Sequence, residues 1–240
     1  MKPFVDIHQH LLYGIDDGPR AKVDMYDMLD AAGEQKITDI IVTPHVTPGV
    51  HRFDQKQFKR ALTIARTYID VAGLDIQLHP GCEILYTQQT TRLLKDVVIP
   101  TLDDSRYILV EFSPDDSYNH IYKALEDILS NGYLPILAHV ERYACLTRSA
   151  AKAIQLKEEF GLDVYYQVNC ATIIDDKGFK IRRFITEMLE EQMIDAVATD
   201  AHNVTSRPIK LREAYQVLEQ RCGKSYATQL TNGSVLRNMD

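Results

Sequence analysis

The residues in this sequence that are best suited to chemistry are histidines and carboxylates at the ends of apolar runs. The first run, Phe4-Val-Asp-Ile, leads into His8 and His10. Residues two apart in a strand point the same way, so both imidazoles lie on one face at the strand end. This pairing predicts a metal site, although a hydrogen-bonded pair of surface histidines explains one such motif equally well.

The same pattern recurs along the chain, and its repetition favours the metal site. Later apolar runs, or the turns that follow them, supply further imidazoles and carboxylates. Left unpaired in a partly buried site, so many ionisable groups would each cost several kcal/mol, and divalent cations compensate that cost best. The candidate metal ligands are His8, His10, Asp17, His45, Glu83, Glu111, His139, Asp200 and His202.

The number and type of these residues constrain the metal. They exceed what one ion accepts, because zinc takes about four ligands and octahedral ions take about six. Two or three divalent ions bridged by a carboxylate are therefore expected. Nitrogen and oxygen ligands without cysteine suit manganese, iron or zinc more than calcium or magnesium, and manganese is favoured.

The apolar runs alternate with amphipathic stretches, which is typical of a parallel sheet buried on both faces. One helical stripe contains Met25, Met28 and Leu29, and another runs from Phe58 to Ile69, with Gly73 placed as a C-terminal cap. We expect an α/β fold, a TIM-like barrel of seven β/α units with a parallel inner sheet, and the alternative is a doubly wound open sheet. The expected strands are 4–10, 39–45, 75–78, 107–112, 134–139, 164–169 and 195–202, and the expected helices are 21–35, 58–69, 121–129, 149–160, 179–192 and 208–221.

Size, charge and composition narrow the class of protein. A chain of 240 residues with 45% hydrophobic residues supports one sizeable core, so residues 1–240 are expected to form a single domain. The net charge of -7 argues against a protein that binds nucleic-acid backbones. No apolar run approaches the roughly 18 residues of a membrane span, and no secretory segment is evident. A cytoplasmic protein with reduced cysteines is expected, and its oligomeric state stays open.

Taken together, the motifs resemble those of the polymerase and histidinol phosphatase (PHP) superfamily. More narrowly, they are similar to the bacterial metal-dependent tyrosine phosphatases encoded with capsule and exopolysaccharide genes, and the segments 99–107 and 167–169 fit this narrower group. The motifs are Asp6-Ile-His-Gln-His10, Asp16-Asp-Gly-Pro19, Thr43-Pro-His45, Gly81-Cys-Glu83, Glu111-Phe112, His139-Val-Glu-Arg142 and Asp200-Ala-His202.

The resemblance implies a distorted barrel of seven β/α units that holds three metal ions. It places His8, His10, Glu83 and Asp200 on the first ion, Glu83, Glu111 and His139 on the second, and Asp17, His45 and His202 on the third. Arg142 and Arg207 match positions that grip the substrate phosphate. The implied substrate is the phosphotyrosine-bearing tail of a bacterial tyrosine kinase that controls polysaccharide assembly.

The two arginines also have plain structural interpretations. Arg142 is suited to an ion pair with Glu141 or with a neighbouring helix, and Arg207 to a surface charge at a helix N-terminus. The chain departs from the family after His45, where five residues precede His51 and Arg52. Which residues bind the substrate on that side is therefore an open question.

A mechanism follows for a metal-dependent phosphatase. Metal-activated water would attack phosphorus in line, while the arginine forks neutralise charge on the transferring oxygens. A phenolate leaves with a pKa near 10, so a strong general acid is less needed than for an alkyl alcohol. A cysteine phosphatase is excluded, because a phosphate-binding loop needs arginine six positions after cysteine and no cysteine here has one.

Two other functions stay open. One is a small-molecule phosphoesterase, such as a histidinol phosphatase, or a nuclease-like relative. The other is a non-enzymatic binding module whose metal ions are structural. Bound water or phosphate on the ions would separate an open catalytic site from a closed structural one.

Overall fold

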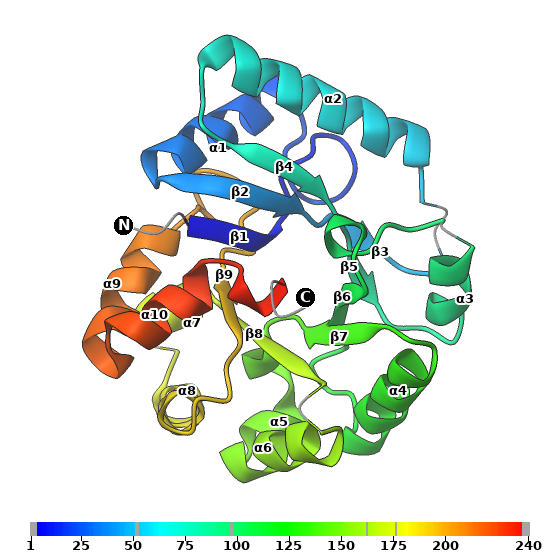
Figure 1. Cartoon of the computed structure of the whole chain (residues 1–240), viewed down its shortest axis with the longest axis vertical. Helices are drawn as coiled ribbons and strands as arrows, with labels where there is room; N and C mark the ends of the chain where they lie inside the picture. Colours follow the sequence, from blue (N-terminus) through cyan, green and yellow to red (C-terminus); the bar gives the residue numbers. More distant parts are fainter. Residues whose placement is uncertain (1–3, 51–52, 97, 162, 176, 237–240) are drawn as a thin grey trace.

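The computed structural model describes residues 4–50, 53–96, 98–161, 163–175 and 177–236. Its strands follow the wall of a barrel, and helices lie outside them (Figure 1). Every pairing between neighbouring strands is parallel. The strands are β1 (Phe4–Gln9), β2 (Ile37–Val42), β3 (His45–Val46), β4 (Gln77–Pro80), β5 (Glu83–Leu85), β6 (Tyr107–Glu111), β7 (Leu134–Leu137), β8 (Tyr165–Asn169) and β9 (Ala196–Ala198).

Hydrogen bonding divides these strands into two sheets, β1-β2-β4 and β3-β5-β6-β7-β8-β9. The sheets adjoin because β3 follows β2 after two residues, and β5 follows β4 after two residues. On the other side, the amide of His10 donates to the carbonyl of Ala201 at 2.9 Å, and the amide of Asp200 donates to the carbonyl of His8 at 2.8 Å. The end of β1 therefore lies beside the segment that follows β9.

The expected α/β class, parallel sheet and TIM-like course of the strands are confirmed. The count of seven β/α units is not confirmed, because the described part of the chain contains nine strands. The expected strand 39–45 is interrupted at Thr43–Pro44, and a second interruption, at Gly81–Cys82, separates β4, in the region of the expected strand 75–78, from β5. Each interruption lies directly before a candidate metal ligand, His45 in the first case and Glu83 in the second.

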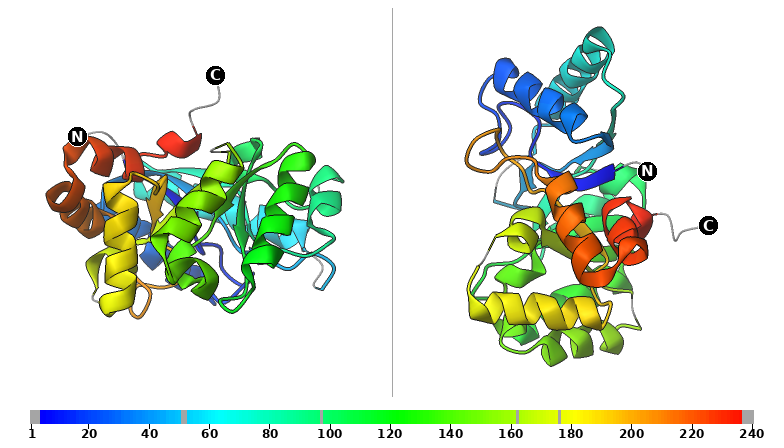
Figure 2. Two further views of the ribbon diagram at one scale, coloured as in Figure 1. Left: turned by 90° about the horizontal axis from the view of Figure 1, so that it is seen from below. Right: turned by 90° about the vertical axis from the view of Figure 1, so that its left-hand side faces the viewer.

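The helices cover the outer surface of the strands (Figure 2). α9 and α10 pack against β1 and β9, so the last helices cover the place where the first and last strands meet. The α-helices are α1 (Lys22–Glu34), α2 (Gln55–Ala72), α3 (Thr90–Lys95), α4 (Tyr118–Ser130), α5 (Ala144–Thr147), α6 (Ala150–Glu159), α7 (Cys170–Ile174), α8 (Phe179–Glu190), α9 (Leu211–Cys222) and α10 (Lys224–Thr231), and the 3₁₀ turns are η1 (Leu102–Asp104), η2 (Val140–Arg142) and η3 (Ser234–Leu236).

Local sequence explains where α2 begins and ends. The side chain of Asp54 accepts the amides of Lys56 and Gln57, both at 3.0 Å, and so caps the helix N-terminus. At the other end, Gly73 adopts φ 66°, the left-handed conformation that glycine tolerates, as expected for a C-terminal cap. Between the caps, the stripe from Phe58 to Ile69 is buried against the strands.

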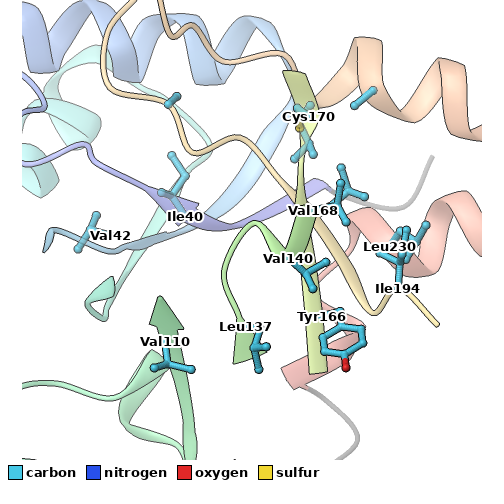
Figure 3. Packing of buried hydrophobic residues seen from close by; sticks show 14 of the residues in the cluster. Ile40, Val42, Val110, Leu137, Val140, Tyr166, Val168, Cys170, Ile194 and Leu230 are labelled. Carbon is cyan, nitrogen blue, oxygen red and sulfur yellow. The ribbon is translucent and has the colours of Figure 1, made fainter. Parts of the chain in front are cut away.

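The hydrophobic core lies between the strands and the surrounding helices. Figure 3 shows a part in which Val110 and Leu137 come from neighbouring strands and Leu230 comes from α10. Each such side chain stabilises the fold by about 1.5–3 kcal/mol when fully buried. All four cysteines are free thiols, as expected. Within the ranges described, no helix combines the length and apolar character that crossing a membrane requires.

Candidate metal centre

The fold gathers all nine predicted ligands in one cluster. Seven stand near or after the C-terminal end of a strand, and His45 and Glu83 stand at the start of β3 and β5, each separated by two residues from the end of β2 or β4. Their placement follows from the chain's course, because each stands on a strand end or in the loop directly after one. His8 belongs to β1, and His10 and Asp17 follow it; His45 begins β3; Glu83 begins β5; Glu111 ends β6; His139 follows β7; and Asp200 and His202 follow β9.

Glu83 stands at the middle of this cluster and is fully buried. Its Oε2 atom lies 3.2 Å from Nε2 of His8, 3.2 Å from Nε2 of His10 and 3.1 Å from Nδ1 of His45. Its Oε1 atom lies 2.8 Å from Nε2 of His139. Despite these neighbours, Oε2 has no hydrogen bond of acceptable geometry. A buried carboxylate oxygen that faces several imidazole nitrogens without bonding them suits a shared cation, so these residues fit a metal centre.

The side chains fall into three overlapping groups whose ligand atoms lie within 4.8 Å of one another. The first group is the set expected for one ion. The second contains His45 where His139 was expected, although His139 Nε2 lies 3.7 Å from Glu111, and the third adds His10 to the expected set. The groups are His8, His10, Glu83 and Asp200; His45, Glu83 and Glu111; and His10, Asp17, His45 and His202.

Charges in the cluster shift one another strongly. Burial disfavours the imidazolium of His8, but attraction to Glu83 and Asp200 outweighs burial and raises the pKa of His8. The pKa of His10 rises well above its ordinary value because contacts with Asp16, Asp200 and Glu83 likewise outweigh burial. Burial raises the pKa of Glu83, yet the surrounding imidazoles hold that pKa well below its usual range. The cluster therefore keeps Glu83 ionised, as metal ligation requires.

His202 is arranged differently from the other histidines. Its Nδ1 atom lies 2.9 Å from the carbonyl oxygen of Asp200, which fixes the tautomer that carries hydrogen on Nδ1. The Nε2 atom then points its lone pair into the centre and has no hydrogen-bond partner. Burial, together with the charges of His10 and Arg207, lowers the pKa of His202 to about 4. The ring is thus neutral at physiological pH, the form that binds a metal ion.

Two of the predicted ligands have backbones in the left-handed region. The φ angles are 34° at His139 and 50° at Asp200, which is uncommon for residues other than glycine. Such a conformation costs about 1–2 kcal/mol per residue. The His139 amide donates to Oε1 of Gln167 at 2.8 Å, and the Asp200 amide donates to His8, so neighbouring strands hold both conformations in place.

Asp16 supports the centre, although the sequence analysis gave it no role. Its Oδ2 atom lies 2.7 Å from Nδ1 of His10 and also accepts the amide of His45 at 3.0 Å. Contact with His10 and the amides of Gly18 and His45 lowers the pKa of Asp16 to about 2, against the effect of burial. A Cβ atom at Gly18 would lie 2.4 Å from the carbonyl oxygen of His10, so only glycine permits this turn. The sequence did contain a signal for this turn, the segment Asp16-Asp17-Gly18.

A second support is a hydrogen-bonded relay of two amide side chains on β8. Gln167 Oε1 lies 3.0 Å from Nδ1 of His8, and Gln167 Nε2 donates to Asn169 Oδ1 at 2.8 Å. Asn169 Nδ2 in turn donates to Asp200 Oδ2 at 2.7 Å. The relay therefore orients two residues of the same metal group from behind.

Arg142 and Arg207 lie at the rim of the centre, with exposed fractions of 44% and 37%. Arg142 donates to Asp200 Oδ2 at 2.8 Å, and Arg207 donates to Asp200 Oδ1 at 2.9 Å. Arg207 also donates to Asp17 Oδ2 at 3.3 Å. The ion pair of Arg142 with Glu141 is not observed: Arg142 pairs with Asp200, and Glu141 Oε1 accepts the amide of Asn169 at 3.0 Å.

The remaining expectation concerned the segment after His45. His51 and Arg52 lie outside the described residues. Their contribution to substrate binding therefore stays a prediction.

Comparisons with known proteins agree with this geometry. The model of a family described as capsular polysaccharide synthesis, CpsB/CapC, matches residues 4–236. The tyrosine-protein phosphatase CpsB from Streptococcus pneumoniae is 30% identical over 231 residues, which cover 94% of each chain.

Solved structures extend the comparison to the fold. A chain from a study of YwqE from Bacillus subtilis and CpsB from Streptococcus pneumoniae, described as metal-dependent tyrosine phosphatases, superposes with a TM-score of 0.88 at 29% identity. That match covers 98% of this chain and 95% of the other. A histidinol phosphate phosphatase from Lactococcus lactis has a TM-score of 0.58 at 12% identity and covers 95% of this chain and 97% of the other. The second likeness shows the fold alone.

Proposed function

This chain belongs to the CpsB/CapC family of capsular polysaccharide synthesis proteins, and we propose that it is a metal-dependent protein-tyrosine phosphatase. The relatives named tyrosine-protein phosphatase match nearly the whole chain, which supports carrying over the activity as well as the fold. One observation of the site carries the proposal: Arg142 and Arg207 each donate to one oxygen of Asp200, at the rim of a largely buried cluster of predicted metal ligands.

The proposed metal complement is three divalent ions, with manganese favoured. The nine ligands expected from the sequence would hold them, and Glu83 would be the carboxylate shared between two ions. When bound, the ions lower the pKa of water toward neutrality and place positive charge beside the phosphate. The supporting observations are the three overlapping ligand groups, two of which share Glu83, and the absence of cysteine from all three.

The arginines would bind the phosphate and stabilise its charge during transfer. Arg142 and Arg207 are anchored to Asp200, which sets their guanidinium groups at fixed positions, and each is partly exposed toward the rim. A guanidinium has five N–H donors, so donors stay available for phosphate oxygens. A tyrosine phenolate leaves with a pKa near 10, and it therefore departs with less help from an acid than an alkyl alcohol needs.

The proposed substrate is the phosphotyrosine-bearing tail of a bacterial tyrosine kinase that acts in capsule or exopolysaccharide synthesis. The family's description supports a role in capsular polysaccharide synthesis. A kinase tail is the kind of substrate that joins that role to tyrosine phosphatase activity. Such a tail would be met in the cytoplasm, which is where we place the protein.

Substrate preference tests this proposal. The purified, manganese-loaded protein should release phosphate from phosphotyrosine peptides with a far higher kcat/KM than from histidinol phosphate. The reverse preference would select the small-molecule phosphoesterase. Tightly held metal ions with no hydrolysis of either substrate would select the non-enzymatic module, whose ions are coordinatively saturated.

A further inference from the structure

A pocket of about 450 Å³ opens beside the metal centre, a size common for ligand sites. Asp17 and His45 belong both to the centre and to the wall of this pocket. Ile15, Val46 and Phe53 supply apolar wall. A molecule in the pocket would therefore contact an apolar surface and two of the predicted metal ligands at once.

Two of the three acidic residues on the pocket wall, Asp16 and Asp54, make hydrogen bonds within the protein, and the third, Asp17, is a predicted metal ligand. Both oxygens of Asp16 are occupied, by His10 and the His45 amide on one side and by the Gly18 amide on the other. The carboxylate of Asp54 caps α2. Beside Asp17, the wall offers a ligand the apolar side chains of Ile15, Val46 and Phe53.

Phe53 is held in place by a second aromatic ring. The ring centroids of Phe53 and Phe58 lie 5.4 Å apart and the planes are inclined by 52°, a favourable arrangement for two aromatic rings. Phe58 is 5% exposed and belongs to the core through α2, whereas Phe53 is only partly buried. Phe53 thus presents a braced aromatic face to the pocket.

We propose that this pocket binds the aromatic ring of the phosphotyrosyl side chain, with Phe53 as the wall that contacts the ring. The inference rests on the proposed function, because the phosphate must lie at the metal centre for its ring to enter. Arg207 links the two regions through its contact with Asp17, so phosphate at the arginines lies beside the pocket. The short alkyl chain of a phosphoserine would leave most of the apolar wall uncovered. The pocket therefore selects aryl phosphates over alkyl phosphates.

Two inhibitors with the same head group isolate the ring. Phenylphosphonate and methylphosphonate share the phosphonate group, and the first carries a phenyl ring where the second carries a methyl group. Both are compared as inhibitors of phosphotyrosine hydrolysis by the manganese-loaded protein. The wild type should bind phenylphosphonate more tightly. Phe53→Ala should reduce that preference by roughly two- to tenfold, the contribution of one aromatic contact. The inhibition constant of methylphosphonate should not change.

Further variants separate a lost wall from a damaged fold. Phe53→Leu should restore part of the preference because it keeps an apolar side chain, and Ile15→Ala should weaken it from another position on the wall. Phe179→Ala is the matched control, since Phe179 is 72% exposed on α8 and does not line the pocket. It should leave both inhibition constants unchanged.

The outcomes distinguish this inference from the function beneath it. Hydrolysis of phosphotyrosine with equal affinity for both inhibitors, or an unchanged preference in Phe53→Ala, would overturn the ring site and leave the phosphatase intact. A wild type that neither hydrolyses phosphotyrosine nor binds either phosphonate would overturn both.

Discussion

The Nδ1 atom of His10 lies 2.7 Å from Oδ2 of Asp16, and His10 is fully buried. This contact decides which ring nitrogen of His10 faces the metal centre. With Nδ1 engaged, Nε2 is directed at Glu83 at 3.2 Å. A carboxylate behind a ligating histidine fixes the ring's orientation and raises its basicity as a ligand. Asp16 is therefore a positioning residue for the proposed metal centre.

The first prediction concerns Asp16→Ala, which removes this support and keeps every predicted ligand. Loss of such a contact commonly lowers metal affinity by about 10- to 100-fold. We expect a weaker manganese affinity in calorimetric titration, with turnover restored at high manganese concentration. Asp75→Ala, at an exposed carboxylate before β4, is the control and should match the wild type. An unchanged manganese affinity in Asp16→Ala would exclude the positioning role.

The second prediction concerns the relay on β8. Gln167→Leu keeps the approximate shape of the side chain but leaves the His139 amide and His8 Nδ1 without their buried partner. An unsatisfied buried polar group costs about 1–3 kcal/mol, so the free energy of unfolding of the chelated protein should fall by about that amount. Urea denaturation measures it. Gln155→Leu, on the exposed face of α6, is the matched control and should have little effect. Equal unfolding free energies for the two variants would contradict the relay.

The third prediction concerns pH and the protein treated with a chelator. The pKa values of His8 and His10 are raised above the ordinary 6.5 in the fold. Their stabilising contribution is therefore fully present below 6.5 and is lost as pH rises through the raised native values. The carboxylates behave oppositely: the pKa of Glu83 lies below the ordinary 4.5, so its contribution is lost only as pH falls through the native value.

It follows that the Tm of the chelated protein should fall as pH rises above about 6.5. The manganese-loaded protein should gain stability over the same interval, because protons compete with metal for the imidazoles. Differential scanning calorimetry of both forms tests whether their stabilities change with pH in opposite directions. A chelated protein whose Tm rises with pH in this interval would contradict the assigned shifts.

The fourth prediction concerns the phosphate grip. Arg142→Ala and Arg207→Ala should each lower kcat/KM for phosphotyrosine peptides by roughly two orders of magnitude, the effect of losing one preorganised donor to transition-state charge. Metal content at saturating manganese should stay the same, because neither arginine is a predicted ligand. Arg183→Ala, an exposed arginine paired with Glu187 on α8, serves as the control. Unchanged turnover in either test variant would remove that arginine from the mechanism.

Much of the fold was predictable because burial is regular along the chain. The stripe of α2 and its Gly73 cap, for instance, were both evident from spacing alone. The interruptions at Thr43–Pro44 and Gly81–Cys82 were not, because they depend on how neighbouring strands hydrogen-bond. The short α3, α5 and α7 were missed for a related reason: each is less than two turns long and shows no full hydrophobic period.

In the candidate site, too, some features were predictable from the sequence and others depend on the folded geometry. The nine predicted ligands converge because parallel strands end at one face, a rule that needs no coordinates. Asp16 and Gln167 act through hydrogen bonds to a ligand's far ring nitrogen, and which polar group reaches that nitrogen depends on the folded geometry. A signal existed for Gln167, since an amide between Tyr166 and Val168 in a buried strand needs polar partners. Phe53 gave no signal, because the pocket that it lines appears only when α2 and the loop after β1 are placed together.

The dependence of activity on metal tests the central claim most directly. Turnover of an aryl phosphate should be measured on chelated protein, on the same protein after adding manganese, and on His139→Ala with manganese, together with the metal content of each. The account predicts no turnover after chelation, recovery with manganese, and loss of turnover with reduced metal content in His139→Ala. Turnover that persists in the chelated protein, or that survives undiminished in His139→Ala, would contradict it.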